Sequence, residues 1–157
     1  MATREQRRGR KIAMSAGELD TVLAEERTCR VGTVGRDGTP HVTPLWFVWD
    51  GTSVWLNSIV RSQRWVDIER QPAVSVMVDA GTEYFELRGV EITGTATAVG
   101  EVPRTGEQQL AELEEPERRY ARKYSGSDQM HYDGRHAWLR VTPTKIASWD
   151  FRKLGSA

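Results

Sequence analysis

Val54–Pro72 reads VWLNSIVRSQRWVDIERQP, and this stretch decides both the fold and the candidate site. It predicts a buried strand over Val54–Asn57, then a polar turn, then a helix over Arg61–Arg70 that ends before the proline. Backbone N–H groups at a helix N-terminus are unpaired and partly positive, so they favour an anion there. The guanidinium groups of Arg61 and Arg64 would add two-point hydrogen bonds to phosphate oxygens. The alternative is that both arginines are solvated charges on a surface helix.

The residues before this stretch predict a helix followed by an antiparallel meander. Ser15 and Glu18 have the S-x-x-E spacing of a capping box, which predicts a helix that ends near Arg27. Turn signals at Gly35–Gly38 and at Asp50-Gly51 then separate runs of β-type residues. The predicted strands are Cys29–Val34, Pro40–Trp49 and Ser53–Asn57.

Two strands are predicted directly after the stretch. Ala73–Asp79 (AVSVMVD) alternates as a strand, and the turn at Gly81-Thr82 leads into a long strand over Tyr84–Val99. Gly89 and Gly94 inside the long strand indicate bulges or bends of the kind that curl a sheet.

Prolines interrupt two of the C-terminal segments. Pro116 predicts two short helices within the helical composition of Thr105–Tyr124. Ser125–Arg135 lacks a regular pattern and predicts a loop. Pro143 predicts a break between two final strands, at Ala137–Val141 and Lys145–Phe151.

The order of these elements predicts the fold class. About six or seven strands with flanking helices, and no βαβ alternation, predict a mainly β (α+β) chain that closes as an antiparallel barrel. A chain of 157 residues is long enough for one domain. We expect that domain to span residues 13–157 and residues 1–12 to form a basic, disordered tail.

Composition excludes several classes of protein. The chain is 38% hydrophobic and has zero net charge, and its N-terminus carries a surplus of four positive charges. Without a basic body, nucleic acid is not an expected partner. No apolar run reaches the length of a membrane span or of a secretion signal, so we expect a cytoplasmic protein. Cys29 is the sole cysteine, and we interpret it as a small core residue.

The chain offers no obvious catalytic side chains. The three histidines, His41, His131 and His136, are not spaced as metal ligands, and no metal site is expected. No nucleophile motif occurs either, and this absence favours chemistry carried by a bound cofactor. Pro44 cannot donate within a strand, so that strand runs along an edge, bulges or faces a ligand.

Three stretches in this order and spacing carry a resemblance to a known family. They are GTVGRDGTPHVTPLWF (Gly32–Phe47), RSQRWVDIERQP (Arg61–Pro72) and AVSVMVD (Ala73–Asp79). The chain resembles the pyridoxamine 5′-phosphate oxidase-like split β-barrel superfamily. More narrowly, it resembles the actinobacterial flavin/deazaflavin oxidoreductases of group B, whose better-known members use the deazaflavin coenzyme F420. Arg119–Tyr124 and Lys145–Asp150 extend the resemblance.

The resemblance implies a cofactor site after the third strand and along the second. Arg64 stands where relatives commonly have lysine, and Asp67 stands where they often have asparagine. The resemblance also implies a homodimer with shared sites, in which Tyr84 and Trp149 are candidates for the wall that the second subunit supplies. The implied cofactor-binding residues are Thr43, Pro44, Leu45, Trp46, Asn57, Ser58, Arg61, Ser62, Gln63 and Arg64.

The resemblance implies an F420-dependent oxidoreductase that transfers a hydride to a small conjugated organic substrate. An FMN-dependent member of the same superfamily and a non-catalytic carrier of F420, FMN or haem are the alternatives. The basic N-terminal residues could hold the oligoglutamate tail of F420. The catalytic residues stay unknown, and His41 is a poor candidate for the proton donor.

Overall fold

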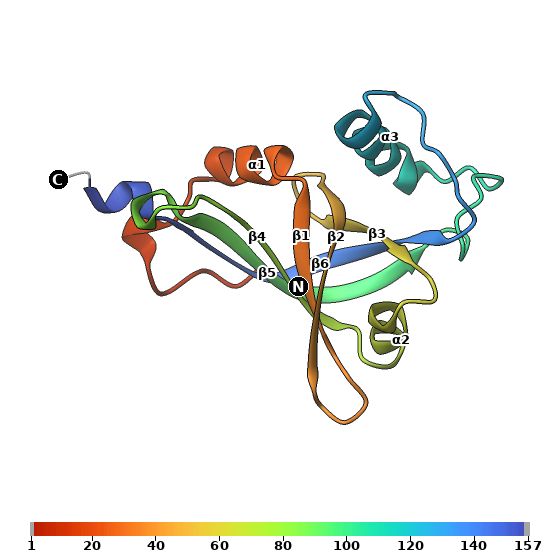
Figure 1. The fold of residues 1–157 in the computed structure, drawn as a ribbon, viewed down its shortest axis with the longest axis horizontal. Coiled ribbons are helices and arrows are strands. Elements are labelled where there is room, and N and C mark those ends of the chain that lie inside the picture. Colours follow the sequence, from red (N-terminus) through yellow and green to blue (C-terminus); the bar gives the residue numbers. More distant parts are fainter. Residues whose placement is uncertain (1, 156–157) are drawn as a thin grey trace.

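The computed structural model of the chain describes residues 2–155, so Met1 and residues 156–157 lie outside the described part. All six strands pair antiparallel and close a barrel in the order β1-β2-β3-β6-β5-β4, which confirms the predicted fold class (Figure 1). The strands are β1 (Thr28–Val34), β2 (Pro40–Trp49), β3 (Val54–Ile59), β4 (Ala73–Ala80), β5 (Arg88–Val99) and β6 (His136–Asp150). The helices are α1 (Ala16–Glu25), α2 (Gln63–Arg70) and α3 (Ala111–Ser125), with 3-10 turns η1 (Arg10–Ile12), η2 (Tyr84–Glu86) and η3 (Phe151–Gly155).

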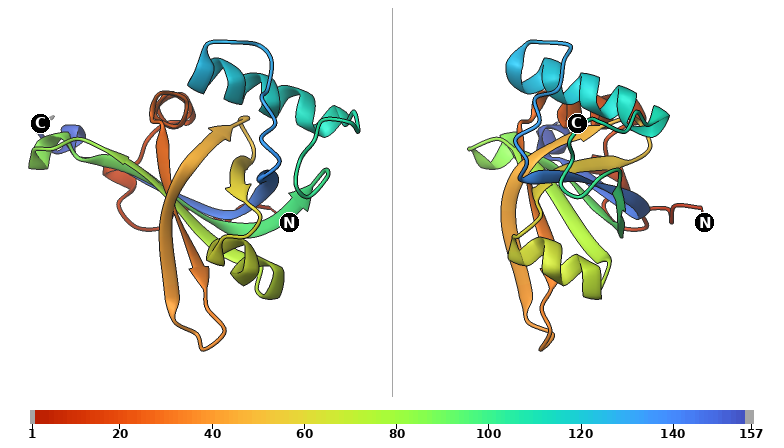
Figure 2. Two further views of the ribbon diagram at one scale, coloured as in Figure 1. Left: turned by 45° about the vertical axis from the view of Figure 1, so that its right-hand side comes forward. Right: turned by 90° about the vertical axis from the view of Figure 1, so that its right-hand side faces the viewer.

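The alternation of β3 divides the apolar residues between two layers. Val54 and Leu56 belong to the large cluster that fills the barrel. Trp55 faces the other way and packs with Trp138 and Leu113 in a smaller cluster beneath α3. Helices α1 and α2 lie on opposite sides of the barrel, and α3 covers the outer face of β2 and β3 (Figure 2). Because successive side chains of a strand point to opposite faces, β3 contributes one set of residues to the barrel interior and another set to the surface that packs against α3.

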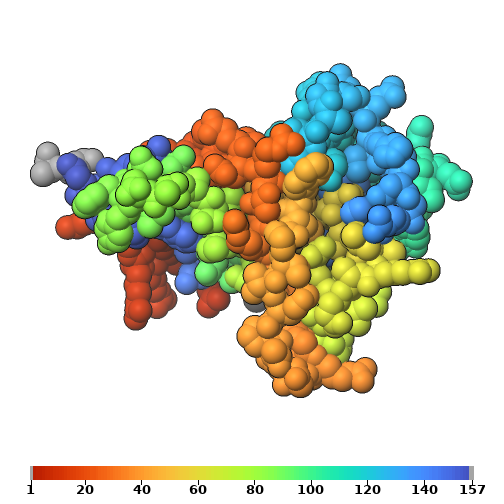
Figure 3. All heavy atoms as spheres, viewed as in Figure 1, coloured from red at the N-terminus to blue at the C-terminus, as the bar shows by residue number. Residues whose placement is uncertain are grey.

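The predicted N-terminal elements are confirmed. Ser15 caps α1, since its hydroxyl accepts from the Glu18 backbone N–H at 3.2 Å and the Glu18 carboxylate accepts from the Ser15 N–H at 2.8 Å. The pairings β1–β2 and β2–β3 form the predicted meander. The β1–β2 hairpin projects from the body of the molecule (Figure 3).

The prediction that Pro116 divides two short helices is wrong. A single helix α3 runs through the proline, and the segment before Ala111 is not helical. Pro116 lacks one intrahelical N–H but is itself buried, as are Leu113 and Ala121 on the same helix. The packing of this face over the barrel therefore outweighs the loss of one hydrogen bond.

The prediction of two final strands around Pro143 is also wrong, because β6 is continuous. Its pairing with β5 shifts register at Thr93/Gly94, where Gly94 pairs with Pro143 and Thr93 pairs with Lys145. The bulge leaves Thr144 outside the register, and its hydroxyl donates to the Thr93 carbonyl at 3.1 Å. The strand thus accommodates its proline at a bulge, where a ladder donor is not required.

Two other predicted boundaries shift. Tyr84–Glu86 forms a 3-10 turn, so the predicted strand Tyr84–Val99 begins only at Arg88. Helix α2 begins at Gln63, because Ser62 is its N-cap. None of the helices within residues 2–155 is long and apolar enough to cross a membrane.

The basic N-terminal residues lie along β6. The Arg4 backbone N–H donates to the Thr144 carbonyl at 2.8 Å, and the Gln6 side chain exchanges hydrogen bonds with the backbone of Ser148. The separation of residues 1–12 from the domain stays a prediction.

Candidate functional site

The implied cofactor-binding residues lie on two faces of the β2–β3 ladder. Because Phe47 and Leu56 fill the barrel, alternation turns Thr43 and Ser58 toward its interior side. Trp46 and Asn57 turn outward, toward α3. The resemblance treats these residues as one set, whereas the strand pleat separates them into an arginine cluster and an aromatic pocket.

The arginine cluster consists of Arg64, Ser58 and Thr43. Arg64 is 7% exposed, and its Nε donates to the Ser58 hydroxyl at 3.0 Å. Its Nη1 donates to the Thr43 hydroxyl. Across residues 2–155 no carboxylate forms an ion pair with Arg64, and burial lowers the pKa of its guanidinium. A buried cation without a counter-ion is costly, so this arrangement favours a bound anion.

The other predicted site residues at the start of α2, Arg61, Ser62 and Gln63, do not contact the arginine cluster through the hydrogen bonds that they form. The Ser62 hydroxyl caps the helix by accepting from the Trp65 N–H at 3.2 Å. The Gln63 amide donates to the Asp67 carboxylate at 2.8 Å. Arg61 is exposed, and it forms no ion pair in the described part of the chain. Whether these residues touch a cofactor stays a prediction.

The carboxylate of Asp67 is held by groups other than Arg64. It is fully buried and accepts from the Thr33 hydroxyl and the Gln63 amide, each at 2.8 Å. These two hydrogen bonds hold the pKa of Asp67 below its usual range. Its other neighbours are Arg70 and His41, each at 3.8 Å. The negative charge of Asp67 is therefore already engaged between α2 and β1.

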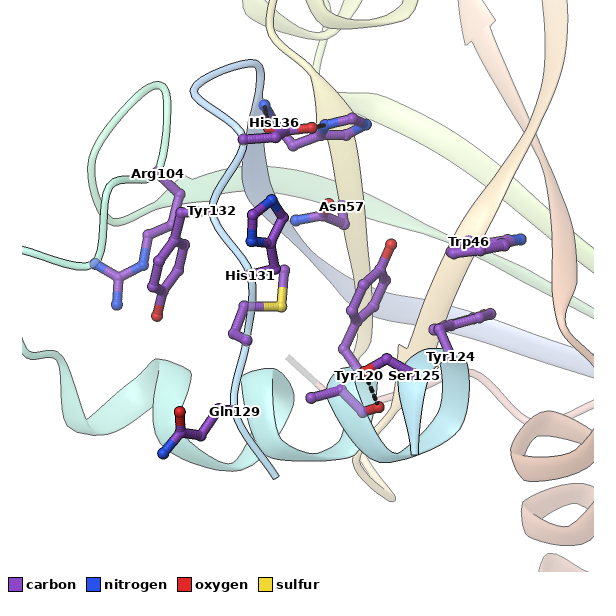
Figure 4. A pocket seen from close by; sticks show the side chains of 13 residues that line it. Trp46, Asn57, Arg104, Tyr120, Tyr124, Ser125, Gln129, His131, Tyr132 and His136 are labelled. Atoms are coloured by element: carbon purple, nitrogen blue, oxygen red, sulfur yellow. Dashed lines mark hydrogen bonds and ion pairs between the residues drawn. The ribbon is translucent and has the colours of Figure 1, made fainter. Parts of the chain in front are cut away.

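The aromatic pocket lies between the outer face of the sheet and α3, with a volume of about 320 Å³. Trp46 and Asn57 come from β2 and β3, and Tyr120 and Tyr124 come from α3 (Figure 4). The segment 129–133 and His136 complete the wall. Sequence reasoning did not identify these α3 and loop residues as a site. The two tyrosines, four residues apart in the RYARKY segment, are the signal that could have found them.

Tyr124 fixes the floor of the aromatic pocket. Its ring stacks on Trp46 with centroids 4.2 Å apart and planes 7° apart. Its hydroxyl accepts from the Phe47 N–H at 3.0 Å and donates to the Arg27 carbonyl at 2.6 Å. Burial raises the pKa of Tyr124. Since Trp46 is nevertheless 44% exposed, the stack leaves a flat surface that a planar ligand could cover.

Pro44 and Leu45 have structural explanations. Strand β2 pairs with β1 over Pro40–Trp46 and with β3 over Phe47–Trp49. Pro44 therefore lies in the half of the strand that has one neighbour, which is the edge position that the missing N–H allows. Leu45 packs against the barrel cluster.

Tyr84 and Trp149, the residues implied for a partner subunit, lie away from the aromatic pocket. Tyr84 is 61% exposed in η2, at the opposite end of the molecule from α3 (Figures 1 and 3). The Trp149 ring packs so closely on Gly89 that a Cβ there would approach its Cζ2 to 2.4 Å. The sequence predicts a bulge or a bend at Gly89. The strand pairing shows no bulge at Gly89, which instead marks a close approach of the Trp149 ring.

Lys123 is a half-buried amine between α1, α3 and β2. Its Nζ donates to the Leu23 and Phe47 carbonyls at 3.1 and 3.4 Å and lies 3.9 Å from the centre of the Phe47 ring. Burial lowers the pKa of Lys123 from 10.5 to about 8.

This lowered pKa predicts a pH-dependent stability difference. Between pH 8 and 10.5 the unfolded chain holds more protons at Lys123 than the folded chain, so the contribution of Lys123 to the free energy of unfolding should rise with pH. Relative to Lys123→Met, the gain should be about 1–2 kcal/mol after solvent screening. Urea unfolding of both proteins at several pH values measures it. Both retain Cys29, whose pKa burial raises to about 12, so the part of its opposing contribution that burial causes is common to the two proteins. The charge of Lys123 also lowers the pKa of Cys29, and that coupling is included in the difference.

Comparison with known proteins places the chain in a family. The family model described as pyridoxamine 5′-phosphate oxidase matches residues 15–150. The chain belongs to this family. A search of curated proteins finds no match.

Several solved structures share the fold. The conserved hypothetical protein Rv2991 from Mycobacterium tuberculosis is 29% identical, with a TM-score of 0.77 over 97% of this chain and 93% of that one. An F420 reductase is 22% identical, with a TM-score of 0.59 over 81% and 94% of the two chains. An FAD-binding protein from Mesorhizobium loti is 19% identical, with a TM-score of 0.64 over 87% and 93%.

Proposed function

We propose that the protein is an F420-dependent oxidoreductase that reduces a small conjugated organic substrate. The observation that carries the proposal is Arg64, a buried guanidinium that bonds two hydroxyls and has no carboxylate partner among residues 2–155. Family membership and the shared fold of an F420 reductase support a flavin-like cofactor. The cofactor would supply the hydride, and the protein would bind and orient it.

The residues present fit such a cofactor. Arg64 offers a planar, charged guanidinium group, and Ser58 and Thr43 offer two hydroxyls. These groups are suited to hydrogen bonds with phosphate oxygens. The aromatic pocket has the size of a small-molecule site and walls of Trp46 and two tyrosines, which are suited to a flat ring. Asn57 of the pocket and Ser58 of the arginine cluster are consecutive near the end of β3 and point to opposite faces of the sheet, so one cofactor would pass the end of that strand to reach both.

The proposal includes a homodimer in which each subunit completes the other's site. Two sets of exposed apolar side chains support it. Val42 and Trp46 lie on the outer face of β2, and Tyr84 and Phe85 lie in η2, which neighbours η3 with its exposed Leu154. Exposed apolar patches of this kind are typical of interaction surfaces. Sedimentation equilibrium checks this part, and a strictly monomeric protein would contradict it. A cytoplasmic location belongs to the same proposal and is supported by the one cysteine, which is a free thiol.

Titration of the purified protein with F420, reduced F420 and FMN tests the cofactor. Tryptophan fluorescence is the readout, because exposed Trp46 lies in the pocket wall. We expect F420 to bind more tightly than FMN. Protein purified with a flavin spectrum, or tighter binding of FMN, would support the FMN-dependent alternative. Micromolar binding of reduced F420, without its oxidation by any of a panel of enones and quinones, would identify a carrier.

A further inference from the structure

His136 and Asp133 form a fixed pair in the wall of the aromatic pocket. The His136 Nδ1 lies 2.6 Å from an Asp133 carboxylate oxygen. The other carboxylate oxygen accepts from the backbone N–H groups of Arg135 and His136 at 2.9 and 3.1 Å. Burial alone would raise the pKa of Asp133, but these hydrogen bonds outweigh burial and lower it, so the group is a carboxylate at neutral pH.

The backbone of His136 is held by two neighbouring segments. His136 begins β6 and pairs with Ile59 at the end of β3, and its carbonyl accepts from the Arg104 N–H at 2.8 Å. In Figure 4 its ring lies beside Asn57, on the β3 side of the pocket. With Nδ1 bound to Asp133, Nε2 is the ring nitrogen without a protein partner in the described part of the chain. The imidazole is thus oriented by a carboxylate and open to the pocket.

The other titratable side chains of the pocket are engaged or poorly suited as acids. The Tyr124 hydroxyl donates to the Arg27 carbonyl, and the Tyr132 hydroxyl donates to Glu117 at 2.8 Å. Arg104 is paired with Glu117 and Glu101. Burial raises the pKa of Tyr120 to about 12. His131 lines the pocket too but forms no ion pair with a carboxylate among residues 2–155.

We propose that His136 donates the proton that completes reduction of the substrate, with Asp133 as its positioning residue. The inference rests on the proposed function. In the reduction of an enone, the β-carbon accepts the hydride that the cofactor supplies, and the π electrons of the C=C bond move to the carbonyl, forming an enolate. The enolate takes the Nε2 proton of the His136 imidazolium, whose charge the Asp133 carboxylate balances. The substrate gains two protons and two electrons: the hydride carries one proton and both electrons, and His136 gives the second proton. The neutral imidazole then regains its proton from water.

Oxidation of reduced F420 by cyclohex-2-en-1-one, followed by absorbance, tests the proposal in the full chain. His136→Gln should lower kcat by about 100-fold or more. In the wild type kcat should fall as pH rises, because the proposed donor must carry its proton, whereas the residual rate of His136→Gln should lack this pH dependence. Asp133→Asn should lower kcat less. His41→Gln, a histidine outside the pocket, serves as the matched control and should keep the wild-type rate.

A second readout needs neither cofactor nor turnover. Nitrogen-15 NMR of the histidine rings should show His136 in the Nδ1–H tautomer, and Asp133→Asn should shift that equilibrium. A His136 ring with no tautomer preference, or a His136→Gln enzyme with the wild-type rate and pH profile, would overturn the inference while the proposed function stands. Wild-type protein that binds F420 but oxidises none of its reduced form with any enone would overturn both.

Discussion

Replacing Arg64 with alanine will weaken F420 binding by roughly 10- to 150-fold. The estimate corresponds to about 1.5–3 kcal/mol, the usual contribution of a hydrogen bond to a charged group. Arg64 is buried and donates hydrogen bonds to the hydroxyls of Ser58 and Thr43. No carboxylate in the described residues balances its charge. An anionic ligand would supply that balance, so the loss should appear in cofactor affinity. Fluorescence titration of the variant with F420 measures it.

Two companion variants make this result specific. Arg36→Ala removes an exposed arginine from the β1–β2 turn and should leave F420 affinity unchanged. Arg64→Lys keeps the charge but loses the planar fork, so its affinity should lie between those of wild type and Arg64→Ala. If Arg64→Ala folds normally by circular dichroism and binds F420 as tightly as the wild type does, the phosphate assignment is wrong.

Replacing Gly94 with alanine will destabilise the barrel by at least about 2 kcal/mol. A Cβ at this position would lie 2.2 Å from the Thr142 carbonyl oxygen, 2.9 Å from its carbon and 3.2 Å from the Pro143 Cα. All three are backbone atoms of the paired strand at the bulge, so no side-chain rotation relieves the clash. Chemical denaturation of wild type and variant measures the loss.

Gly17 offers the matched control for Gly94. It lies in the first turn of α1, and a Cβ there would meet nothing within 4 Å. Gly17→Ala should therefore raise the free energy of unfolding by about 0.4–1 kcal/mol, through reduced freedom of the unfolded chain. A stable Gly94→Ala variant would mean that β6 can shift away from the bulge without cost.

The sequence predicted elements well where one local signal dominates. The capping box at Ser15 starts α1, and alternating or continuous apolar runs mark β1 to β4. It predicted poorly where a local rule competes with packing. Pro116 and Pro143 predicted breaks in a helix and in a strand. Pro116 is instead buried within the continuous helix α3, and Pro143 lies at a bulge in the continuous strand β6. Proline removes a donor, but it ends an element only where no packing or bulge compensates.

The candidate site could be predicted only in part. The order strand, polar turn and helix in Val54–Pro72 predicted a candidate phosphate site that includes Arg64, and the structure shows this side chain buried and bonded to Ser58 and Thr43. The pocket walls could not be predicted, since Tyr124 and His136 reach Trp46 and Asn57 only through the barrel closure that joins β6 to β3. Likewise, a pattern of residues does not reveal that Asp133 orients His136.

By itself, the sequence determined the antiparallel barrel, the capped α1 and the strand–turn–helix unit around Arg64, because periodicity, caps and turn residues act over a few neighbours. The tertiary structure alone decided that Arg64 has no carboxylate partner among the described residues, and that the Thr43 face of β2 lies toward the barrel interior while the Trp46 face lies toward α3. It also decided that α3 and the 129–133 segment close the aromatic pocket. Counter-charges and pocket walls come from residues far apart in the chain, and only barrel closure brings them into contact.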